Sequence, residues 1–321
     1  MNPIDLPDDS ASALEDTGVE FGSSSEGFPV ARLGDLLLAM LPRSTGGGFL
    51  ASAWRLARPL STLRREDFYE HDGELANPAA FRARVLETAQ HRRELSRLQR
   101  LQTRMVCSTP WGSSQLATIY AEGIAAHMTA GHGGFRLSAE RNKRIIPSLR
   151  IGSGWYEEDE AWAIVALTFP ELFTSYERAL ADRTIRDKWP DEWEAIFGRP
   201  LQPGESSGKD RRDFEHRHDG DWIVALAITS GHHPGMVEVV AIRGGRRGAN
   251  TMERRCLVPK PEYEGRGPFG FVIDEGRHAA YDGPSSFVGW ERRKASTCFP
   301  IAARSCPAWK RHAGRHSTSS T

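Results

Sequence analysis

The sequence predicts an α+β protein, in which a helical half packs against a small, mostly antiparallel β-sheet and both termini are disordered. Three observations predict this. Apolar residues recur every three or four positions over much of residues 76–200, which is the period of an α-helix. After residue 218 they gather into short β-branched runs bounded by glycine, which is typical of strands. Both ends of the chain are rich in serine and carry no sustained apolar period.

The composition excludes several classes of protein. The 42 basic residues balance the 42 acidic ones, whereas a whole-chain binder of nucleic acid or of an anionic membrane would carry a large positive excess. No apolar run approaches the roughly 18 residues that a membrane span needs. The first twenty residues are acidic, unlike the basic start of a signal peptide. We therefore expect a cytoplasmic protein with no membrane partner.

The cysteines are four in number and make no CxxC pair: Cys107, Cys256, Cys298 and Cys306. This spacing disfavours both a disulfide framework and a zinc module. We expect a reducing compartment, no metal site and no cofactor.

The charge is distributed unevenly along the chain. Residues 1–27 carry seven acids and no base, and residues 290–321 carry seven bases and one acid. Together with the apolar periodicity this divides the chain into six expected segments. They are a disordered acidic tail (1–27), short helices and loops (28–75), the helical half (76–200), a linker (201–218), the β-rich half (219–290) and a disordered basic tail (291–321).

The helices are expected in the first two thirds of the chain. Short ones are predicted over 31–42 and 51–60, and a long one over 78–105, where Phe81, Val85 and Ala89 share a face. The helical half should continue over 113–128, 139–146 (capped by Ser138), 157–168, 175–188 (opened by the capping box of Thr174 and Glu177) and a short helix from Pro190 to Gly198.

The strands are expected in the last third. Trp222–Thr229 and Met236–Arg243 should pair antiparallel, because a loop of six residues is too short for a parallel crossover. The first of these strands is apolar on both faces, which indicates a strand inside the sheet. Residues 255–258 and 269–274 are the third and fourth expected strands.

Several short stretches of the chain form a distinctive ordered series. They are residues 109–112 (TPWG), 132–135 (HGGF), 140–142 (ERN), 154–159 (GWYEED), 221–224 (DWIV), 257–259 (LVP), 262–263 (EY), 270–274 (GFVID) and 284–287 (PSSF). Through them the chain, over about residues 76–290, resembles an uncharacterised bacterial domain of unknown function that is found in chromosomes and mobile elements. The resemblance implies that the helical and β-rich halves form one unit, and it implies no reaction.

A candidate catalytic region follows a glycine-rich turn. It consists of His132, Arg136, Glu157, Glu158 and Asp159. Imidazole, guanidinium and neighbouring carboxylates are the groups that phosphoester hydrolysis uses, with or without a metal. For this chemistry the imidazole and an acid should lie within about 8–10 Å of each other in one cleft. The alternative, which we favour, is a surface histidine beside acids that complement the dipole of a helix start.

Other residues are candidates for binding. Trp111 and Trp155 each lie beside a glycine and would form an aromatic wall for a ligand, although core packing is the commoner use of such rings. Arg141 is a candidate for an anionic group. The histidines at 216, 218, 232 and 233 would hold a metal if they met in space, and are otherwise ordinary loop residues.

Two functions remain open from the sequence. The first is a non-enzymatic accessory or interaction protein, with a protein or nucleic-acid partner bound through the helix from Arg82 to Arg104, which carries a net charge of +5, and through the basic tail. On this helix, arginines that solvate an outer face are the favoured alternative to phosphate contacts. The second function is a phosphoester hydrolase at residues 132–159. We favour the first, because no catalytic signature is complete.

Overall fold

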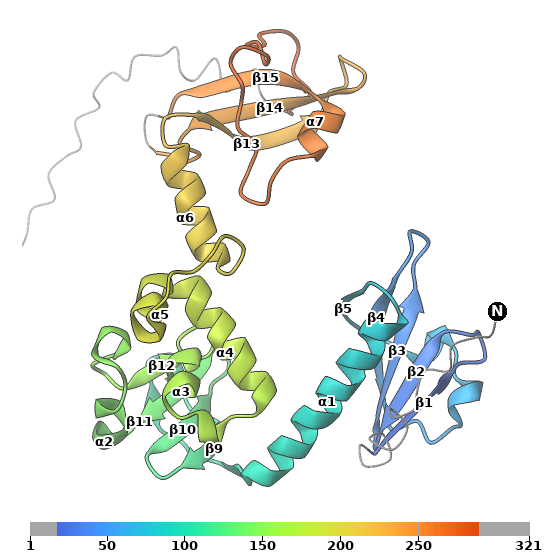
Figure 1. The fold of residues 1–321 in the computed structure, drawn as a ribbon, viewed down its shortest axis with the longest axis vertical. Helices are drawn as coiled ribbons and strands as arrows, with labels where there is room; N and C mark the ends of the chain where they lie inside the picture. Colours follow the sequence, from blue (N-terminus) through green and yellow to red (C-terminus); the bar gives the residue numbers. More distant parts are fainter. Residues whose placement is uncertain (1–17, 249–250, 289–321) are drawn as a thin grey trace, which may run out of the picture. The chain divides into compact units, whose positions relative to one another are not determined.

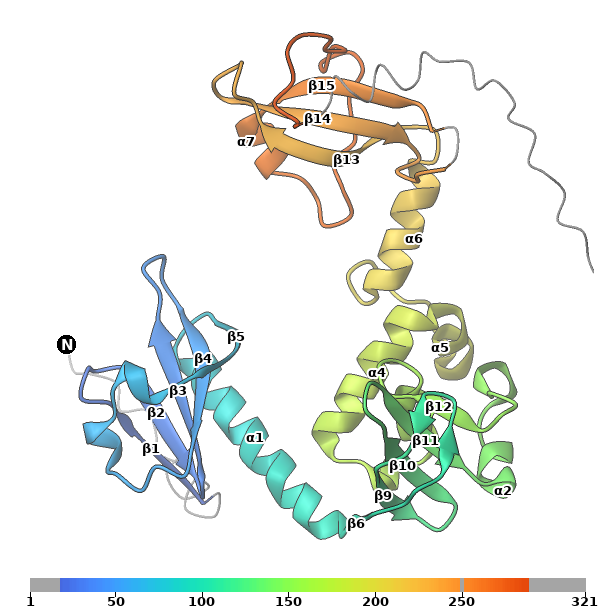
Figure 2. The ribbon, with the colours of Figure 1, turned by 180° about the vertical axis from the view of Figure 1, so that it is seen from behind.

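The computed structural model describes residues 18–248 and 251–288, which form two compact units that divide between Lys209 and Asp210 (Figures 1 and 2). Each unit combines α-helices with antiparallel sheet, so the α+β class is confirmed. The predicted basic tail (291–321) and residues 1–17 of the predicted acidic tail lie outside the described residues. Within the described part of the chain, no helix has the length and apolarity that a membrane crossing needs.

The first unit begins with a five-stranded antiparallel meander (Figure 1). Its strands are paired in chain order: β1 (Val19–Ser23), β2 (Pro29–Leu33), β3 (Leu36–Pro42), β4 (Gly48–Trp54) and β5 (Glu70–Leu75). Two short 3-10 turns, η1 (Leu60–Thr62) and η2 (Arg65–Asp67), lie between β4 and β5. The helices expected over 31–42 and 51–60 are therefore wrong, and β1 contradicts the part of the disordered tail that covers Val19–Ser23.

Strand β3 shows why the sequence suggested a helix here. Alternate residues Leu37, Ala39 and Leu41 belong to the core on one face of the sheet. The intervening Leu36, Leu38 and Met40 belong to the core on the other face. A strand buried on both faces reads as a continuous apolar run and loses the period of two that identifies a strand.

Helix α1 (Pro78–Leu98) covers one face of this sheet. The predicted stripe of Phe81, Val85 and Ala89 is buried there. The helix begins after Asn77, whose side chain accepts a hydrogen bond from the N–H of Ala80, and it ends at Gln99. It is shorter than the predicted 78–105, because Gln99 takes a left-handed conformation and the chain then continues into a strand.

Several arginines of this region make contacts inside the first unit. Arg92 donates to the carbonyl of Leu33 at 2.7 Å and to Asp35 at 2.9 Å. Arg100 forms a bidentate ion pair with the Glu177 carboxylate, with its two guanidinium NH2 groups donating at 2.8 and 2.6 Å. These contacts support a packed helix in preference to one that lies along a phosphate backbone.

The rest of the first unit is built on a second sheet. Its strands are β6 (Leu101–Thr103), β9 (Leu116–Ala121), β10 (Ile124–Met128), β11 (Gly133–Leu137) and β12 (Trp155–Glu157). They lie in the order β12-β11-β10-β9-β6, and all neighbours are antiparallel. A small hairpin, β7 (Ser108–Thr109) with β8 (Gly112–Ser113), precedes β9.

The prediction of a helix over 113–128 is wrong, and the segment expected to be the helical half (76–200) also contains the five strands of the second sheet. The apolar spacing of four residues that suggested the helix is an even number, so it also places side chains on one face of a strand. The signal that separates the two structures is the turn at Glu122-Gly123, where Gly123 has a φ of +77°. This turn joins β9 to β10.

Helices cover one face of the second sheet. α3 (Trp162–Thr168), α4 (Ser175–Lys188) and α5 (Pro190–Phe197) share a core with β10, β11 and β12, and the sheet lies in front of them in Figure 2. The predicted start of α4 is confirmed, because the side chains of Thr174 and Glu177 cap each other's backbone N–H. The predicted end of α5 at Gly198 is also confirmed.

Two of the predicted helices are shorter than expected. α2 (Ala139–Lys143) is capped by Ser138 as predicted, but it ends three residues early. α3 begins at Trp162 and not at residue 157, because Glu157 ends a strand and residues 158–161 form a turn.

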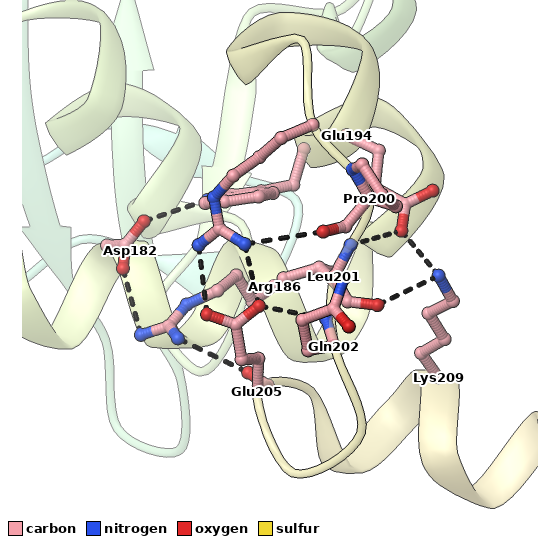
Figure 3. A network of polar contacts seen from close by, with 10 residues as sticks. Asp182, Arg186, Glu194, Pro200, Leu201, Gln202, Glu205 and Lys209 are labelled. Carbon is pink, nitrogen blue, oxygen red and sulfur yellow. Dashed lines mark hydrogen bonds and ion pairs between the residues drawn. The ribbon is translucent and has the colours of Figure 1, made fainter.

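A network of polar contacts fixes the loop that follows α5 (Figure 3). The Glu205 carboxylate accepts hydrogen bonds from Arg199 at 2.7 and 2.9 Å and from the N–H of Gln202 at 2.8 Å. Glu194 accepts from the N–H of Leu201 at 2.6 Å and pairs with Lys209. The segment predicted as a linker over 201–218 therefore begins as an ordered loop and continues as helix α6 (Ser207–Arg217).

This network predicts a loss of stability in acid. Hydrogen bonds from Arg199, then from the N–H of Gln202, lower the pKa of Glu205 to about 2 from a usual 4.5. The stabilisation is therefore present above pH 4.5 and is lost as the pH falls from there towards 2. We expect the Glu205→Gln variant to show a shallower fall of melting temperature over this interval. Equal slopes in the variant and the parent would contradict the prediction.

The second unit contains a three-stranded antiparallel sheet. Strands β13 (Trp222–Thr229), β14 (Met236–Arg243) and β15 (Glu253–Pro259) lie in the order β13-β14-β15, so the predicted pairing of the first two is confirmed. Helix α7 (Lys260–Glu264) follows β15. Residues 269–274 were predicted to form a strand, but they make only two isolated bridges, from Gly270 to Gly267 and from Val272 to Ile223.

The prediction that β13 lies inside the sheet is wrong. β14 is the central strand, and β13 is at the edge with Ala225 and Ala227 exposed. Alanine is small enough to be tolerated on an exposed face, so an apolar count does not distinguish an edge strand from a central one.

A buried ion pair holds the segment after residue 280 against β14 and β15. Glu238 and Arg255 are 3.0 Å apart and both are buried. Glu238 also accepts from the hydroxyl of Ser285 at 2.6 Å and from the N–H of Ser286 at 2.7 Å. Burial raises the pKa of Glu238, but these hydrogen bonds outweigh it and the pKa is lowered. The carboxylate is therefore ionised at neutral pH.

Two matched substitutions test the sheet order. Val239→Asp places a charge in the centre of β14, where the side chain is fully buried, and should cost about 3–5 kcal/mol of unfolding free energy in the second unit. Ala225→Asp, on the exposed edge strand, should change it by less than about 0.5 kcal/mol. Denaturant unfolding of the full chain measures both, and similar losses in the two variants would contradict the observed strand order.

Candidate functional site

The site lies on the face of the second sheet opposite the helices. In the pairing of β11 with β12, Phe135 faces Tyr156 and Arg136 faces Trp155. Paired residues on neighbouring strands share a face of the sheet. Phe135 and Tyr156 belong to the helix-covered core, so Arg136, Trp155 and Glu157 lie on the other face, which we call the open face.

Trp111 packs onto the open face from the tip of the β7–β8 hairpin. It lies over Gly134, where a Cβ atom would be 2.4 Å from the indole ring and 2.4 Å from the carbonyl oxygen of Tyr156. The rings of Trp111 and Trp155 are 5.7 Å apart and perpendicular. The two binding candidates, Trp111 and Trp155, therefore lie next to each other on the open face.

His132 lies in the turn between β10 and β11. The Thr129 side chain organises this turn by accepting from the N–H of His132 at 3.2 Å, and the N–H of Thr129 donates to the His132 carbonyl at 3.0 Å. Gly133 begins β11, where a Cβ would meet Glu158 and the carbonyl of His127. The turn leaves the His132 side chain 61% exposed.

Of the three acids, Glu157 ends β12, and Glu158 and Asp159 lie in the turn that follows it. The Glu157 carboxylate accepts from the N–H of Asp159 at 2.6 Å and of Glu160 at 3.1 Å, which fixes its orientation. Nδ1 of His132 lies 3.9 Å from a Glu158 oxygen. The idea that these acids complement a helix start is wrong, because they precede α3 and its first turn carries no acid.

The structure therefore brings together His132 and all three acids. One possible ligand atom from each of His132, Glu157 and Asp159 lies within 4.8 Å of the others. An imidazole nitrogen with two carboxylate oxygens suits divalent ions such as Mn²⁺ or Zn²⁺. No metal site was expected from the sequence. The donors come from two segments about 25 residues apart, and these are joined by the pairing of β11 with β12 and by the hydrogen bond from the N–H of Glu158 to the carbonyl of Gly133 at 3.1 Å.

The candidate arginines are divided by the fold. Arg136 stands on the open face, where its guanidinium donates to the carbonyl of Ser153 and lies 5.2 Å from the centre of the Trp155 ring. Arg141 donates instead to the carbonyl of Glu122 at 3.0 Å, at the β9–β10 turn. It is not part of the group around His132.

Sequence reasoning missed three residues on the open face. Nδ1 of His127 lies 3.6 Å from Sγ of Cys107 and 3.1 Å from Oγ of Ser114. Burial, and then the charge of Arg136, lower the pKa of His127. The spacing of these residues in the sequence does not predict the cluster, because its members come from β10 and from the two ends of the β7–β8 hairpin.

The four histidines of residues 216–233 form no metal-binding group within the described ranges. His218 contacts Asp221 at 2.7 Å, and His233 contacts the hydroxyl of Tyr281 at 3.0 Å. These contacts favour ordinary, non-ligating histidines, although His216 lies in helix α6 and not in a loop.

The fold and the site define an α+β domain with one helix-covered face and one face that gathers imidazoles, acids and indoles. Residues 104–219 match the family described as a domain of unknown function (DUF7007), which confirms the resemblance to such a family and covers a shorter span than expected. No curated protein and no solved structure matches the chain.

The close approach at Gly134 gives a test of this packing. In Gly134→Ala the new methyl group would collide with the Tyr156 carbonyl, which cannot move away as a side chain can. We expect a loss of about 1–3 kcal/mol in unfolding free energy, as for other overpacked sites. Gly131→Ala is the control, since nothing lies within 4 Å of its Cβ. A control that loses as much would contradict this packing.

Proposed function

We propose that the chain is a non-enzymatic interaction protein whose DUF7007 segment binds a divalent cation at His132, Glu157 and Asp159. The proposal rests on the convergence of these three donors within 4.8 Å. Through the open coordination positions of the cation, the segment would bind an anionic group of a partner molecule.

The exposure of the site supports recognition more than catalysis. Three protein ligands leave coordination positions that a partner can occupy. Side-chain exposures of 61% for His132 and 47% for Glu158 make these positions accessible to a large partner. Electrostatic stabilisation of a transition state is strongest in a site that excludes water. An exposed turn does not exclude water.

Arg136 supports an anionic partner group. It adds a fixed positive charge to the same face, since its position is set by the Ser153 carbonyl and by the Trp155 ring. A planar guanidinium beside a cation suits phosphate or carboxylate oxygens. A phosphate group on the partner could belong to nucleic acid or to a phosphorylated protein, since both carry it. Nucleic-acid binding along the segment from Arg82 to Arg104 has less support, because Arg92 and Arg100 are engaged in intramolecular contacts. The thiols of Cys107 and Cys256, both free, favour a reducing compartment such as the cytoplasm.

A phosphoester hydrolase is the second candidate. It is favoured by the Glu158 oxygen 3.9 Å from Nδ1 of His132. In that function the cation would lower the pKa of a bound water, and Glu158 would accept its proton.

Cation binding tests the proposal directly. Calorimetric titration of the full chain with Mn²⁺ or Zn²⁺ should give one site in the first unit. Asp159→Asn and His132→Gln should each weaken binding by about tenfold or more, because each removes one of three ligands. Glu171→Gln removes an exposed acid elsewhere in the unit and should bind as the parent does. The proposal is wrong if the parent shows no binding, or if the control loses as much affinity.

A second measurement separates the two candidate functions. The cation-loaded chain is assayed with an activated phosphodiester such as bis(p-nitrophenyl) phosphate. Binding without turnover supports the interaction protein. Turnover that Glu158→Gln removes, while cation affinity is retained, supports the hydrolase.

A further inference from the structure

We propose that Cys107 is a reactive thiol with His127 as its general base, and that it is modified by small disulfides through thiol–disulfide exchange. This site shares the open face with the proposed cation site but uses none of its ligands.

The β7–β8 hairpin positions the thiol. Its strands pair Ser108 with Ser113, and one step further the N–H of Ser114 donates to the carbonyl of Cys107 at 2.9 Å. Cys107 and Ser114 are therefore opposite each other, and both side chains reach Nδ1 of His127. Cys107 is partly exposed, whereas Cys256 is fully buried.

The imidazole is held in place from several sides. His127 is in the middle of the sheet, paired with Ala117 on β9 and with Gly134 on β11, and only 6% of it is exposed. The ring of Trp155 lies 5.3 Å from the imidazole. Burial, and then the charge of Arg136, lower the pKa of His127, so the imidazole is in its neutral form at neutral pH.

The Sγ–H proton of Cys107 passes to Nδ1 of His127 while the sulfur attacks one sulfur of the disulfide. The disulfide bond breaks, and a new S–S bond joins Cys107 to one half of the reagent. The other half leaves as a thiolate and takes the proton from the imidazolium, so the products are a mixed disulfide and a free thiol.

Thiol–disulfide exchange fits the structure because its requirements are few. It needs a thiolate, a nearby base and access for the reagent. Cys107 has the partial exposure, and His127 is within hydrogen-bond distance. The added group would lie beside the hairpin that carries Trp111, so modification would alter the open face itself.

The test follows the reaction of the full chain with oxidised glutathione at pH 7, with site-by-site mass spectrometry. Cys107 should react at least about tenfold faster in the parent than in His127→Asn, which keeps a hydrogen-bonding group near the position of Nδ1 but removes the base. Ser114→Ala is the matched control, because it removes the other partner of Nδ1 and leaves the base. It should react as fast as the parent or faster.

Equal rates in His127→Asn and the parent would overturn the proposal, as would a slowing by Ser114→Ala as large as that by His127→Asn. If His127→Asn does not fold, the parent alone gives the answer. Cys107 should then react about tenfold faster in the folded chain than in the chain unfolded in guanidinium. A slower reaction in the folded state would overturn the proposal, whereas Cys256 should be protected there in any case.

Discussion

The pairing of β11 with β12 is the constraint on which the site depends. It sends Phe135 and Tyr156 into the core with the helices, and it leaves Arg136 and Trp155 on the open face. It also brings Glu157, at the end of β12, close to the turn that contains His132. The core residues and the site residues thus lie on opposite faces of the same pair of strands. A shift of the pairing register by one residue would move each set of side chains to the other face.

How far the sequence predicts this fold depends on how each residue is buried. The caps of α4 and α5 were predictable, because Thr174, Glu177 and Gly198 act through local backbone contacts that spacing reveals. Strand β3 was not, because burial on both faces hides its period. Strand β13 was located but misplaced within its sheet, since pairing order is a tertiary property.

The same division holds for the candidate site. His132 and the acids at 157–159 could be singled out from residue types near glycines, and the structure brings them together. The structural role of the acids could not be predicted from the sequence. They were expected in the first turn of a helix, but they lie at the end of β12 and in the turn after it. The pair of Cys107 and His127 left no local pattern at all, because it forms only when a hairpin folds onto the sheet.

The contact between Trp111 and Gly134 has a consequence for sequence variation. A ring at position 111 occupies the space that any side chain at position 134 would need. Among proteins that share this domain, position 134 should therefore be glycine wherever a large ring stands at 111. The Tyr156 carbonyl restricts position 134 in the same way even where the ring is lost. Position 111 should therefore vary more freely than position 134, and a change at 111 should not be accompanied by a larger residue at 134.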